Sequence, residues 1–305
     1  MTRVSVLAPA KVNLSLHVTG RRADGYHLLD TLVAFAPFGD SVGLTAAEDL
    51  TLAVDGPEAS GVPTDRSNLV MRAASALCAA MGAPEQGALH LTKCLPPASG
   101  IGGGSSDAAA ALRAMMALHG WRAEVGAGGV LLLGDDKSLN LAALGADVPM
   151  CFDAGPARVR GIGEDVAAVS LPALPALLVN PRVEVSTPQI FKALATKDNP
   201  PMPADIPAFE GVAECIDWLA SQRNDLEAPA RALAPEIGEV LAALRTLDGC
   251  RLARMSGSGA TCFALFESLP EAEAALAAIQ SSHPDWWAAA GALGDQRAAV
   301  LPVEG

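Results

Sequence analysis

Apolar residues recur along this chain with two spacings, one typical of strands and the other typical of helices. Short stretches in which apolar residues alternate with polar ones, or run together, predict strands. Longer stretches with apolar residues three and four positions apart predict helices. The predicted strands are 4–7, 12–18, 89–95, 176–180, 251–255 and 261–266. The predicted helices are 69–81, 105–119, 136–144, 190–194, 211–221, 236–247 and 270–279.

Turn-forming residues suggest where the chain divides. The first half alternates strands and helices, and the segment 155–175 that follows is rich in Gly and Pro. No internal repeat is visible. We therefore expect a boundary near residue 165, with one domain at 1–165 and a second at 166–305.

A glycine-rich segment, LPPASGIGGGSSDAAA at 95–110, joins a predicted strand to a predicted helix. Gly100 and the glycines at 102–104 allow positive φ and a close approach of the backbone to a ligand. Ser105 and Ser106 open the helix, whose first N–H groups and dipole favour anions. Such a loop suits phosphates, and the serine hydroxyls could bond phosphate oxygens or help to hold Mg²⁺. The alternative is a flexible turn before a well-capped helix.

The common phosphate-binding and nucleophile motifs do not describe this loop. No G-x-x-x-x-G-K-[ST] occurs in the chain, so the loop is not a P-loop. Ser105 stands where the Rossmann fingerprint has its third glycine. No G-x-S-x-G occurs either, so a nucleophile elbow is not supported.

Composition excludes several classes of protein. The chain has 305 residues, of which 50% are hydrophobic and 18% charged, far too apolar a mixture for a disordered protein. Its net charge of −13 argues against a dedicated nucleic-acid binder. The longest stretch without a charged residue, 166–181, contains Pro172 and Pro175 and is too short to span a membrane. We expect neither nucleic acid nor a membrane as a partner.

Six scattered cysteines form no CxxC pair, and five histidines form no HxxxH or HExxH. Reduced, buried thiols and the absence of a structural zinc site are the expected consequences. The N-terminal segment carries a charge inside its apolar run and lacks the apolar core of a signal peptide. We therefore expect a cytoplasmic protein. Because the net charge is negative, any anionic substrate must be bound by a local group of hydrogen-bond donors or positive charges.

The glycine-rich loop resembles the second motif of the GHMP small-molecule kinases, P-x-x-[GS]-G-[LI]-G-[SG]-[SG]-[SA]. APAKVNL at 8–14 is similar to the first motif of that family, and MSGSGA at 255–260 is similar to the third. The resemblance implies an α+β, two-domain fold, with an N-terminal domain like domain 2 of ribosomal protein S5 and a ferredoxin-like C-terminal domain. It also implies an active site in the cleft between them.

Four more segments narrow the resemblance. ADGYHL at 23–28, GADVP at 145–149, VSTPQIF at 185–191 and RNDLE at 223–227 resemble the members that act on a CDP-linked methylerythritol. The resemblance then implies ATP-dependent phosphorylation of its 2-hydroxyl, in the non-mevalonate route to isoprenoid precursors. The matched segments span nearly the whole chain.

The resemblance implies that Lys11 and Asp147 are the catalytic residues. Asp147 would orient the acceptor hydroxyl and take its proton, or favour its loss electrostatically. Lys11 would pair with Asp147 and stabilise the developing alkoxide. The alternatives are a capping aspartate and an ordinary exposed lysine.

Five residues are assigned to the acceptor by the same resemblance, namely Asn13, Tyr26, His27, Thr187 and Phe191. Tyr26, the only tyrosine in the chain, and Phe191 could stack on the two faces of a cytosine. His27 could hydrogen-bond the polar edge of the base. A half-buried tyrosine, a capped histidine and a core phenylalanine are the alternatives.

The resemblance assigns ATP to the glycine loop and three further residues. Mg²⁺ is implied because ATP is used as its magnesium complex, with Ser105, Ser106 and Asp147 as the nearest protein candidates and no dedicated site. Asp107 is a doubtful direct ligand because a carboxylate repels phosphates. The donor residues are Pro96, Pro97, Ala98, Ser99, Gly100, Ile101, Gly102, Gly103, Gly104, Ser105, Ser106, Asn68, Lys93 and Asp107.

Other functions remain open at this point. Another acceptor of the family, such as homoserine, mevalonate or a sugar, is the first alternative, and an ATP-dependent decarboxylase of diphosphomevalonate type is the second. A non-catalytic nucleotide-binding protein is the third, but it would not need both Lys11 and Asp147. We expect small-molecule substrates and a monomer or weak homodimer.

Overall fold

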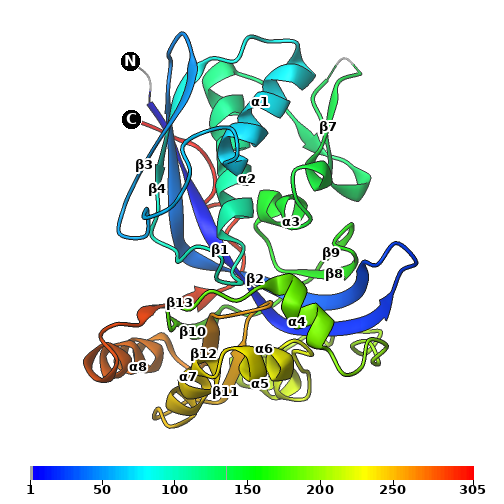
Figure 1. Ribbon diagram of the computed structural model, residues 1–305, viewed down its shortest axis with the longest axis vertical. Helices are drawn as coiled ribbons and strands as arrows, with labels where there is room; N and C mark the ends of the chain where they lie inside the picture. The colour runs from blue at the N-terminus through cyan, green and yellow to red at the C-terminus, as the bar shows by residue number, and fades with distance from the viewer. Residues whose placement is uncertain (1–2, 135) are drawn as a thin grey trace.

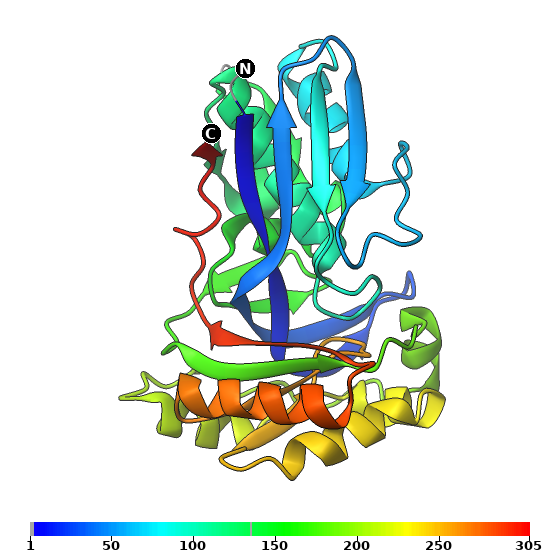
Figure 2. The ribbon, with the colours of Figure 1, turned by 90° about the vertical axis from the view of Figure 1, so that its left-hand side faces the viewer.

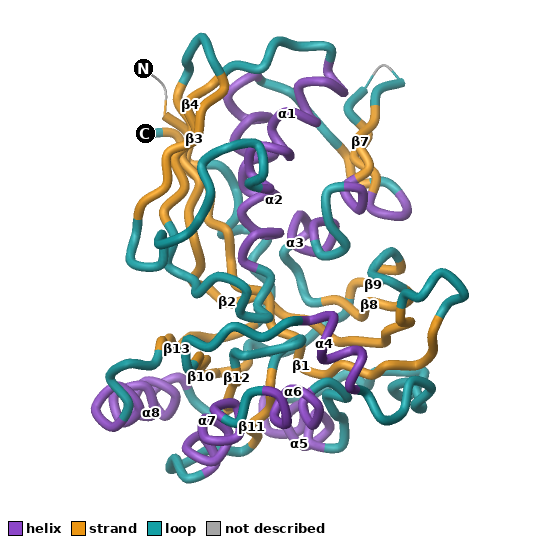
Figure 3. The backbone as a smooth tube through the Cα atoms, in the orientation of Figure 1, coloured by secondary structure: helices purple, strands orange, loops and turns teal. Residues whose placement is uncertain are grey.

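The computed structural model describes residues 3–134 and 136–305. Figure 1 shows an elongated molecule with a tall sheet and two long helices at one end and a second sheet lined by helices at the other. Figure 3 separates these layers by colour, with strands lying between the helices of the two ends.

A seven-stranded sheet runs through the N-terminal half, in the order β14-β1-β2-β4-β3, with β8 and β9 extending from β2. Figure 2 shows its upper strands side by side, with the chain's two ends close together. Its strands are β1 (Arg3–Arg21), β2 (His27–Thr45), β3 (Leu50–Asp55), β4 (Gly87–Thr92), β8 (Ala157–Gly161), β9 (Asp165–Ala168) and β14 (Val303–Glu304).

One long hairpin, β1 and β2, belongs to both ends of the molecule. The hydrophobic pattern predicted two strands where β1 is continuous, because its pairing shifts register between Pro9 and Lys11 instead of breaking. Gly39 on β2 faces this irregularity, and a Cβ there would lie 1.9 Å from the Ala8 carbonyl oxygen. Glycine therefore allows β2 to cross the bulged part of β1.

Two helices cover one face of this sheet, α1 (Leu69–Met81) and α2 (Gly103–His119). The alanines at 108–111 and Ala114 are buried in the N-terminal core, and small side chains allow α2 to pack closely against both its neighbours. Gly120 ends α2 with φ 67°, as the sequence predicted.

The C-terminal half has a four-stranded antiparallel sheet in the order β11-β12-β10-β13, with helices beside it. Ser268 and Glu271 form a capping box that begins the last helix. The strands are β10 (Leu174–Asn180), β11 (Leu252–Met255), β12 (Cys262–Leu265) and β13 (Trp287–Leu293). The helices are α4 (Thr187–Ala193), α5 (Val212–Ala220), α6 (Glu227–Leu233), α7 (Glu236–Arg245) and α8 (Leu269–Ser282).

A central apolar cluster joins the two halves. Val12 and Leu14 of β1 pack in it with Leu178 of β10 and Phe263 of β12, and all four side chains are fully buried. The chain then returns to the N-terminal sheet, where β14 pairs with β1. A division of the chain at residue 165 stays a prediction.

The predicted helix 136–144 is wrong. Its residues form the strand β7 (Ser138–Asn140) and a short 3₁₀ turn, Leu141–Ala143. The Asn140 side chain accepts a hydrogen bond from the Ala142 N–H at 3.0 Å. This bond caps the start of the 3₁₀ turn and separates the turn from β7. β7 pairs with β6 (Val130–Leu132), which in turn pairs with β5 (Glu124–Val125).

Within the described part of the chain, no helix combines the length and the apolar character needed to cross a membrane. All six cysteines are free thiols. Burial raises the pKa of the Cys151 thiol to about 12, so this thiol is neutral at physiological pH.

Candidate active site

A cleft of about 470 Å³ lies where the N-terminal sheet meets the C-terminal half. The glycine loop forms one wall, and the start of α3 (Val148–Asp153) and the loop 255–260 contribute others. The predicted site residues that line it are Lys11, Asn13, Lys93, Pro96, Pro97, Ala98, Ser99, Gly100, Gly102, Gly103, Gly104, Ser105, Asp147, Thr187 and Phe191.

Glycine is required at two points of the loop for different contacts. Gly100 and Gly102 have φ of 75° and 68°. A Cβ on Gly100 would lie 2.6 Å from the carbonyl oxygen of Gly259, so the two glycine-rich loops meet backbone to backbone. A Cβ on Gly102 would lie 3.1 Å from Cβ and from Cε of Lys11. The loop therefore packs closely against both the loop 255–260 and Lys11.

The start of α2 offers backbone donors to the cleft. Gly102 is the N-cap and carries no side chain to cap the helix. The first helical hydrogen bond runs from the Ser106 N–H to the Gly102 carbonyl, so the N–H groups of Gly103, Gly104 and Ser105 precede it. All three residues line the cleft. Such donors, together with the helix dipole, favour an anion at this end of the cleft.

The predicted catalytic pair is an ion pair. The Nζ of Lys11 lies 3.1 Å from Oδ2 of Asp147 and donates a hydrogen bond of 2.7 Å to Oδ1 of Asn13. The Lys11 side chain is 5% exposed, which excludes the ordinary surface lysine. Asp147 stands at the N-cap of α3, but its side chain makes no capping hydrogen bond and is 39% exposed toward solvent. Both charges therefore face the cleft.

Three aromatic or imidazole side chains were assigned to the acceptor, and the structure brings two of them together. The rings of His27 and Phe191 stack with centroids 4.7 Å apart and an interplanar angle of 20°. Burial lowers the pKa of His27, and the charges of Arg21 and Lys197 lower it further, so the imidazole is neutral at pH 7. Tyr26 is 63% exposed at the tip of the β1–β2 hairpin and does not line the cleft.

Lys93 is held by two carboxylates behind the glycine loop. Its Nζ lies 2.9 Å from Oδ2 of Asp107 and also pairs with Asp40. Burial raises the pKa of Asp107 to about 8 against the opposing effect of Lys93, with Asp40 raising it further. Burial alone would lower the pKa of Lys93, but Asp107 and Asp40 outweigh it and raise the value. Burial and Asp40 therefore favour the protonated form of Asp107, while Lys93 favours its ionised form.

Four of the predicted donor residues are engaged elsewhere in the structure and do not line the cleft. The Asn68 side chain caps α1 by accepting from the Val70 N–H at 2.9 Å. The Ser106 hydroxyl donates to the Pro9 carbonyl at 2.7 Å, and Ile101 is fully buried in the central cluster. Asp107, as described above, lies behind the loop. The donor-binding roles of these residues stay predictions.

Two polar residues that were not predicted connect the loops of the site. The Ser256 hydroxyl accepts from the Asn13 N–H at 3.0 Å and donates to the Gly100 carbonyl at 3.1 Å. Asn224 donates to the carbonyls of Met255 and Gly257 at 2.8 and 2.9 Å. Asn224 belongs to the quoted segment RNDLE, and Ser256 to MSGSGA, so the motifs contained the signal although no role was assigned.

Two family models match the chain. The model described as GHMP kinases N terminal domain matches residues 68–154, and the model described as GHMP kinases C terminal matches residues 205–285. The first covers the glycine loop and Asp147, and the second covers the loop 255–260.

Curated relatives match almost the whole chain. A 4-diphosphocytidyl-2-C-methyl-D-erythritol kinase of Dinoroseobacter shibae is 54% identical over 94% of this chain and 93% of its own length. The protein of the same name from Roseobacter denitrificans is 48% identical over 98% of this chain and 96% of its own length.

Solved structures agree with the curated relatives. A crystal structure of 4-(cytidine 5'-diphospho)-2C-methyl-D-erythritol kinase, 35% identical, superimposes with a TM-score of 0.75 over 95% of this chain and 99% of its own. A homoserine kinase from Cytophaga hutchinsonii, 21% identical, superimposes with a TM-score of 0.68 over 99% and 97%. The second likeness is one of fold alone.

Proposed function

Because this chain belongs to the GHMP kinase family, we propose that it transfers the γ-phosphoryl group of ATP to the 2-hydroxyl of 4-diphosphocytidyl-2-C-methyl-D-erythritol. The family and the α+β fold that the sequence motifs predicted are confirmed. The observation that carries the proposal is the ion pair between the buried Lys11 and the cleft-facing Asp147, in which Lys11 packs against the glycine loop at Gly102.

The donor is bound mainly by backbone. ATP supplies the phosphoryl group when it is bound, and the N–H groups at the start of α2 face the cleft in which its phosphates fit. Phosphoryl transfer needs positioning and charge neutralisation more than covalent chemistry from the protein. Gly100 and Gly257, whose loops pack together, set the width of this part of the cleft.

The acceptor hydroxyl lies beside Asp147 in this mechanism. One Asp147 carboxylate oxygen accepts its proton as a bond forms between the acceptor oxygen and the γ-phosphorus, while the bond to the bridging oxygen of ADP breaks. The Lys11 ammonium, 3.1 Å from that carboxylate, stabilises the negative charge that develops on the acceptor oxygen.

Mg²⁺ would be bound here together with ATP and would neutralise charge on its phosphates. Among the described residues no group of three His, Cys, Asp or Glu side chains is arranged to hold a metal. Mg²⁺ in nucleotide sites generally keeps several waters and binds through substrate phosphates plus one or two protein oxygens. Ser105 and Asp147 are the protein candidates: the Ser105 hydroxyl lies next to Gly145, two residues before Asp147, while the Ser106 hydroxyl is already engaged.

The cytosine of the acceptor is placed by His27, Phe191 and Thr187. A base that stacks on Phe191 must take the place that the His27 ring has in this structure, or lie on the opposite face of Phe191. The neutral imidazole of His27 both donates and accepts hydrogen bonds, as the edge of cytosine requires. Tyr26 reaches this base only if the exposed hairpin tip folds inward.

The test is an acceptor panel. Purified protein with Mg-ATP is offered the CDP-linked alcohol, homoserine, mevalonate and galactose in turn, and ADP release is followed. We expect release with the CDP-linked alcohol alone. Turnover with another acceptor instead would contradict the substrate assignment and leave the family intact.

We also propose that the enzyme works in the cytoplasm, on small-molecule substrates and as a monomer or weak homodimer. Its free thiols support the cytoplasmic location.

A further inference from the structure

Thr31 lies beside the catalytic residues, and the mechanism above gives it no role. It is on β2, is 3% exposed and lines the cleft. Its hydroxyl touches neither Lys11 nor Asp147 directly, but it is hydrogen-bonded to Asn13, which holds Lys11.

The direction of each hydrogen bond around Thr31 is determined by a backbone carbonyl. The Thr31 hydroxyl donates to the carbonyl oxygen of Ser15 at 2.5 Å, and because a carbonyl can only accept, the single hydroxyl proton is committed there. The Thr31 oxygen must then accept, and it does so from the Asn13 amide nitrogen at 2.8 Å. The amide oxygen of Asn13 is thereby turned toward the Lys11 ammonium, 2.7 Å away.

This orientation matters because an ammonium has three N–H donors in a tetrahedral arrangement. Asn13 accepts from Lys11 and Asp147 pairs with it, so two of the three directions are set by the protein. The remaining N–H is the one that can meet the acceptor oxygen in the cleft. A flipped Asn13 amide would present donors to a cation and release Lys11 from this geometry.

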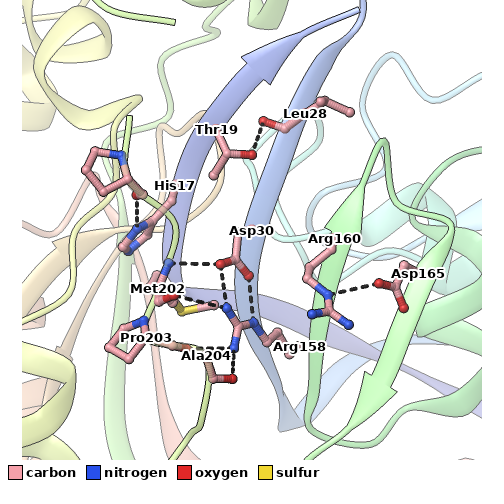
Figure 4. Close-up of polar contacts among 12 residues, drawn as sticks. His17, Thr19, Leu28, Asp30, Arg158, Arg160, Asp165, Met202, Pro203 and Ala204 are labelled. Carbon is pink, nitrogen blue, oxygen red and sulfur yellow. Dashed lines mark hydrogen bonds and ion pairs between the residues drawn. The ribbon is translucent and has the colours of Figure 1, made fainter. Parts of the chain in front are cut away.

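Neighbouring contacts hold Thr31 in place. Asp30, the preceding residue, forms a bidentate ion pair with Arg158 at 2.7 and 2.8 Å, and it also accepts from the Met202 N–H (Figure 4). Successive residues of a strand point to opposite faces, so this anchor on one face of β2 leaves Thr31 facing Asn13 on the other. The Asn13 backbone N–H is itself bonded to Ser256.

We propose that Thr31 is a positioning residue for phosphoryl transfer, which acts by orienting the Asn13 amide and through it the Lys11 ammonium. The proposal rests on the proposed function in that Lys11 is taken as catalytic. It does not depend on which acceptor of the family is the substrate, because Lys11 and Asp147 act on the acceptor hydroxyl in any case.

The first test compares Thr31→Val, which keeps the branched shape and removes the hydroxyl, with Thr31→Ser, which keeps the hydroxyl. We expect Thr31→Val to lower kcat roughly tenfold or more, because a misplaced catalytic group slows transfer, with KM for ATP changed less than about twofold. Thr31→Ser restores most of the rate. Thr19→Val is the matched control: Thr19 also bonds a carbonyl across the same strand pair, at 3.3 Å to Leu28, but away from the cleft (Figure 4).

The second test is a double-mutant cycle with Asn13→Ala. If Thr31 acts through Asn13, adding Thr31→Val to Asn13→Ala lowers kcat no further. Independent, multiplicative losses would overturn the proposal, as would a Thr31→Val enzyme with the parent kcat or a Thr31→Ser enzyme as slow as Thr31→Val. Thermal unfolding verifies that each variant is folded, and Thr31→Ala replaces Thr31→Val if the latter is not.

The two proposals fail in distinguishable ways. A parent protein that ignores the CDP-linked alcohol contradicts the proposed substrate, and the cycle is then run with whichever acceptor of the panel the parent phosphorylates. Only the ratios among the Thr31 and Asn13 variants decide the role of Thr31.

Discussion

At the scale of single residues, the burial of Lys11 supports the catalytic role that we propose for it. Its ammonium is removed from bulk water, lies 3.1 Å from the Asp147 carboxylate and is oriented by Asn13. Charges in a partly dry cleft interact more strongly than the same charges at a surface. Two residues of opposite charge can therefore act on an acceptor oxygen in a protein whose net charge repels anions.

Replacing either member of the pair tests its role. Asp147→Asn keeps the shape and removes the proton acceptor, so we expect kcat to fall by about 10²–10⁴-fold with KM for ATP little changed. Lys11→Met keeps an apolar stem and removes the charge, with a loss of similar size. Steady-state kinetics measure both. Lys137→Met, which changes an exposed lysine whose ammonium donates to the Met81 carbonyl, is the control. Near-parental turnover of Asp147→Asn would exclude its catalytic role.

Asp107 predicts an unusual dependence of stability on pH. Its folded pKa of about 8 exceeds its unfolded value of 3.8, so the folded state binds the proton more tightly. The stability from this proton is greatest below pH 3.8 and has been lost once the pH passes about 8. Asp107→Asn resembles the protonated carboxyl, and we expect its free energy of unfolding to change less between pH 5.5 and 9 than that of the parent.

Chemical denaturation at several pH values measures this difference. Asp165→Asn is the control, because Asp165 pairs with Arg160 where both side chains are about half exposed. If Asp107→Asn shows the same pH dependence as the parent, Asp107 is already ionised in the native protein.

At the scale of elements, the strand–loop–helix unit that ends in α2 forms the wall of the cleft at which we propose that ATP binds. Its glycines allow positive φ, close packing against the loop 255–260 and room for Lys11. The sequence predicted this unit because its information is local: a strand, a glycine run and a helix start follow one another. The sequence could not predict that Asp40 pairs with Lys93, because the two residues come from distant segments of the chain.

Short or irregular elements were missed for a related reason. The helices α3 and α6 are too short for a helical period to be read from the sequence. The long strand β2 mixes polar and apolar residues because it changes its neighbours along its length, pairing with β8 at one end and β4 at the other. Conversely, the pattern at 136–144 suggested a helix that tertiary pairing of β7 prevents.

The fit of the loop around Lys11 can be tested with Gly102→Ala. A methyl group there would lie 3.1 Å from the Lys11 side chain and displace it, so we expect kcat to fall at least tenfold. Gly120→Ala is a matched control: Gly120 has φ 67° against 68° for Gly102, but a Cβ there meets nothing within 4 Å. Both variants lose roughly 1–2 kcal/mol of stability from backbone strain. Equal kcat for the two variants would mean that the contact with Lys11 is unimportant.

At the scale of the whole molecule, the central apolar cluster and the hairpin β1–β2 make the cleft part of one packed structure. β1 carries Lys11 and Asn13 into the cleft while its apolar residues Val12 and Leu14 pack against the C-terminal sheet. The alternation of a strand thus places cleft-lining and core residues next to each other in the sequence. The geometry of the site therefore depends on the contact between the two halves.

Leu14→Ala tests that dependence. Removing a fully buried leucine from the cluster should cost about 2–5 kcal/mol of unfolding free energy, and it should lower the stability of both halves in a single transition. The control is Leu233→Ala, which shortens a side chain of α6 that is 47% exposed. It should change the free energy of unfolding by less than about 0.5 kcal/mol. Circular dichroism and tryptophan fluorescence during denaturation measure both. Two separate transitions would show that the halves are stabilised independently.

The central claim is that Lys11 and Asp147 direct phosphoryl transfer to one hydroxyl of the CDP-linked methylerythritol. Phosphorus NMR of the products formed from that alcohol and Mg-ATP by the purified protein tests this claim most directly. The account predicts equal amounts of ADP and a new phosphomonoester on the 2-oxygen, with the cytidine diphosphate intact and no product from the Asp147→Asn variant. ADP accompanied only by inorganic phosphate, or a phosphomonoester at another oxygen, would contradict it.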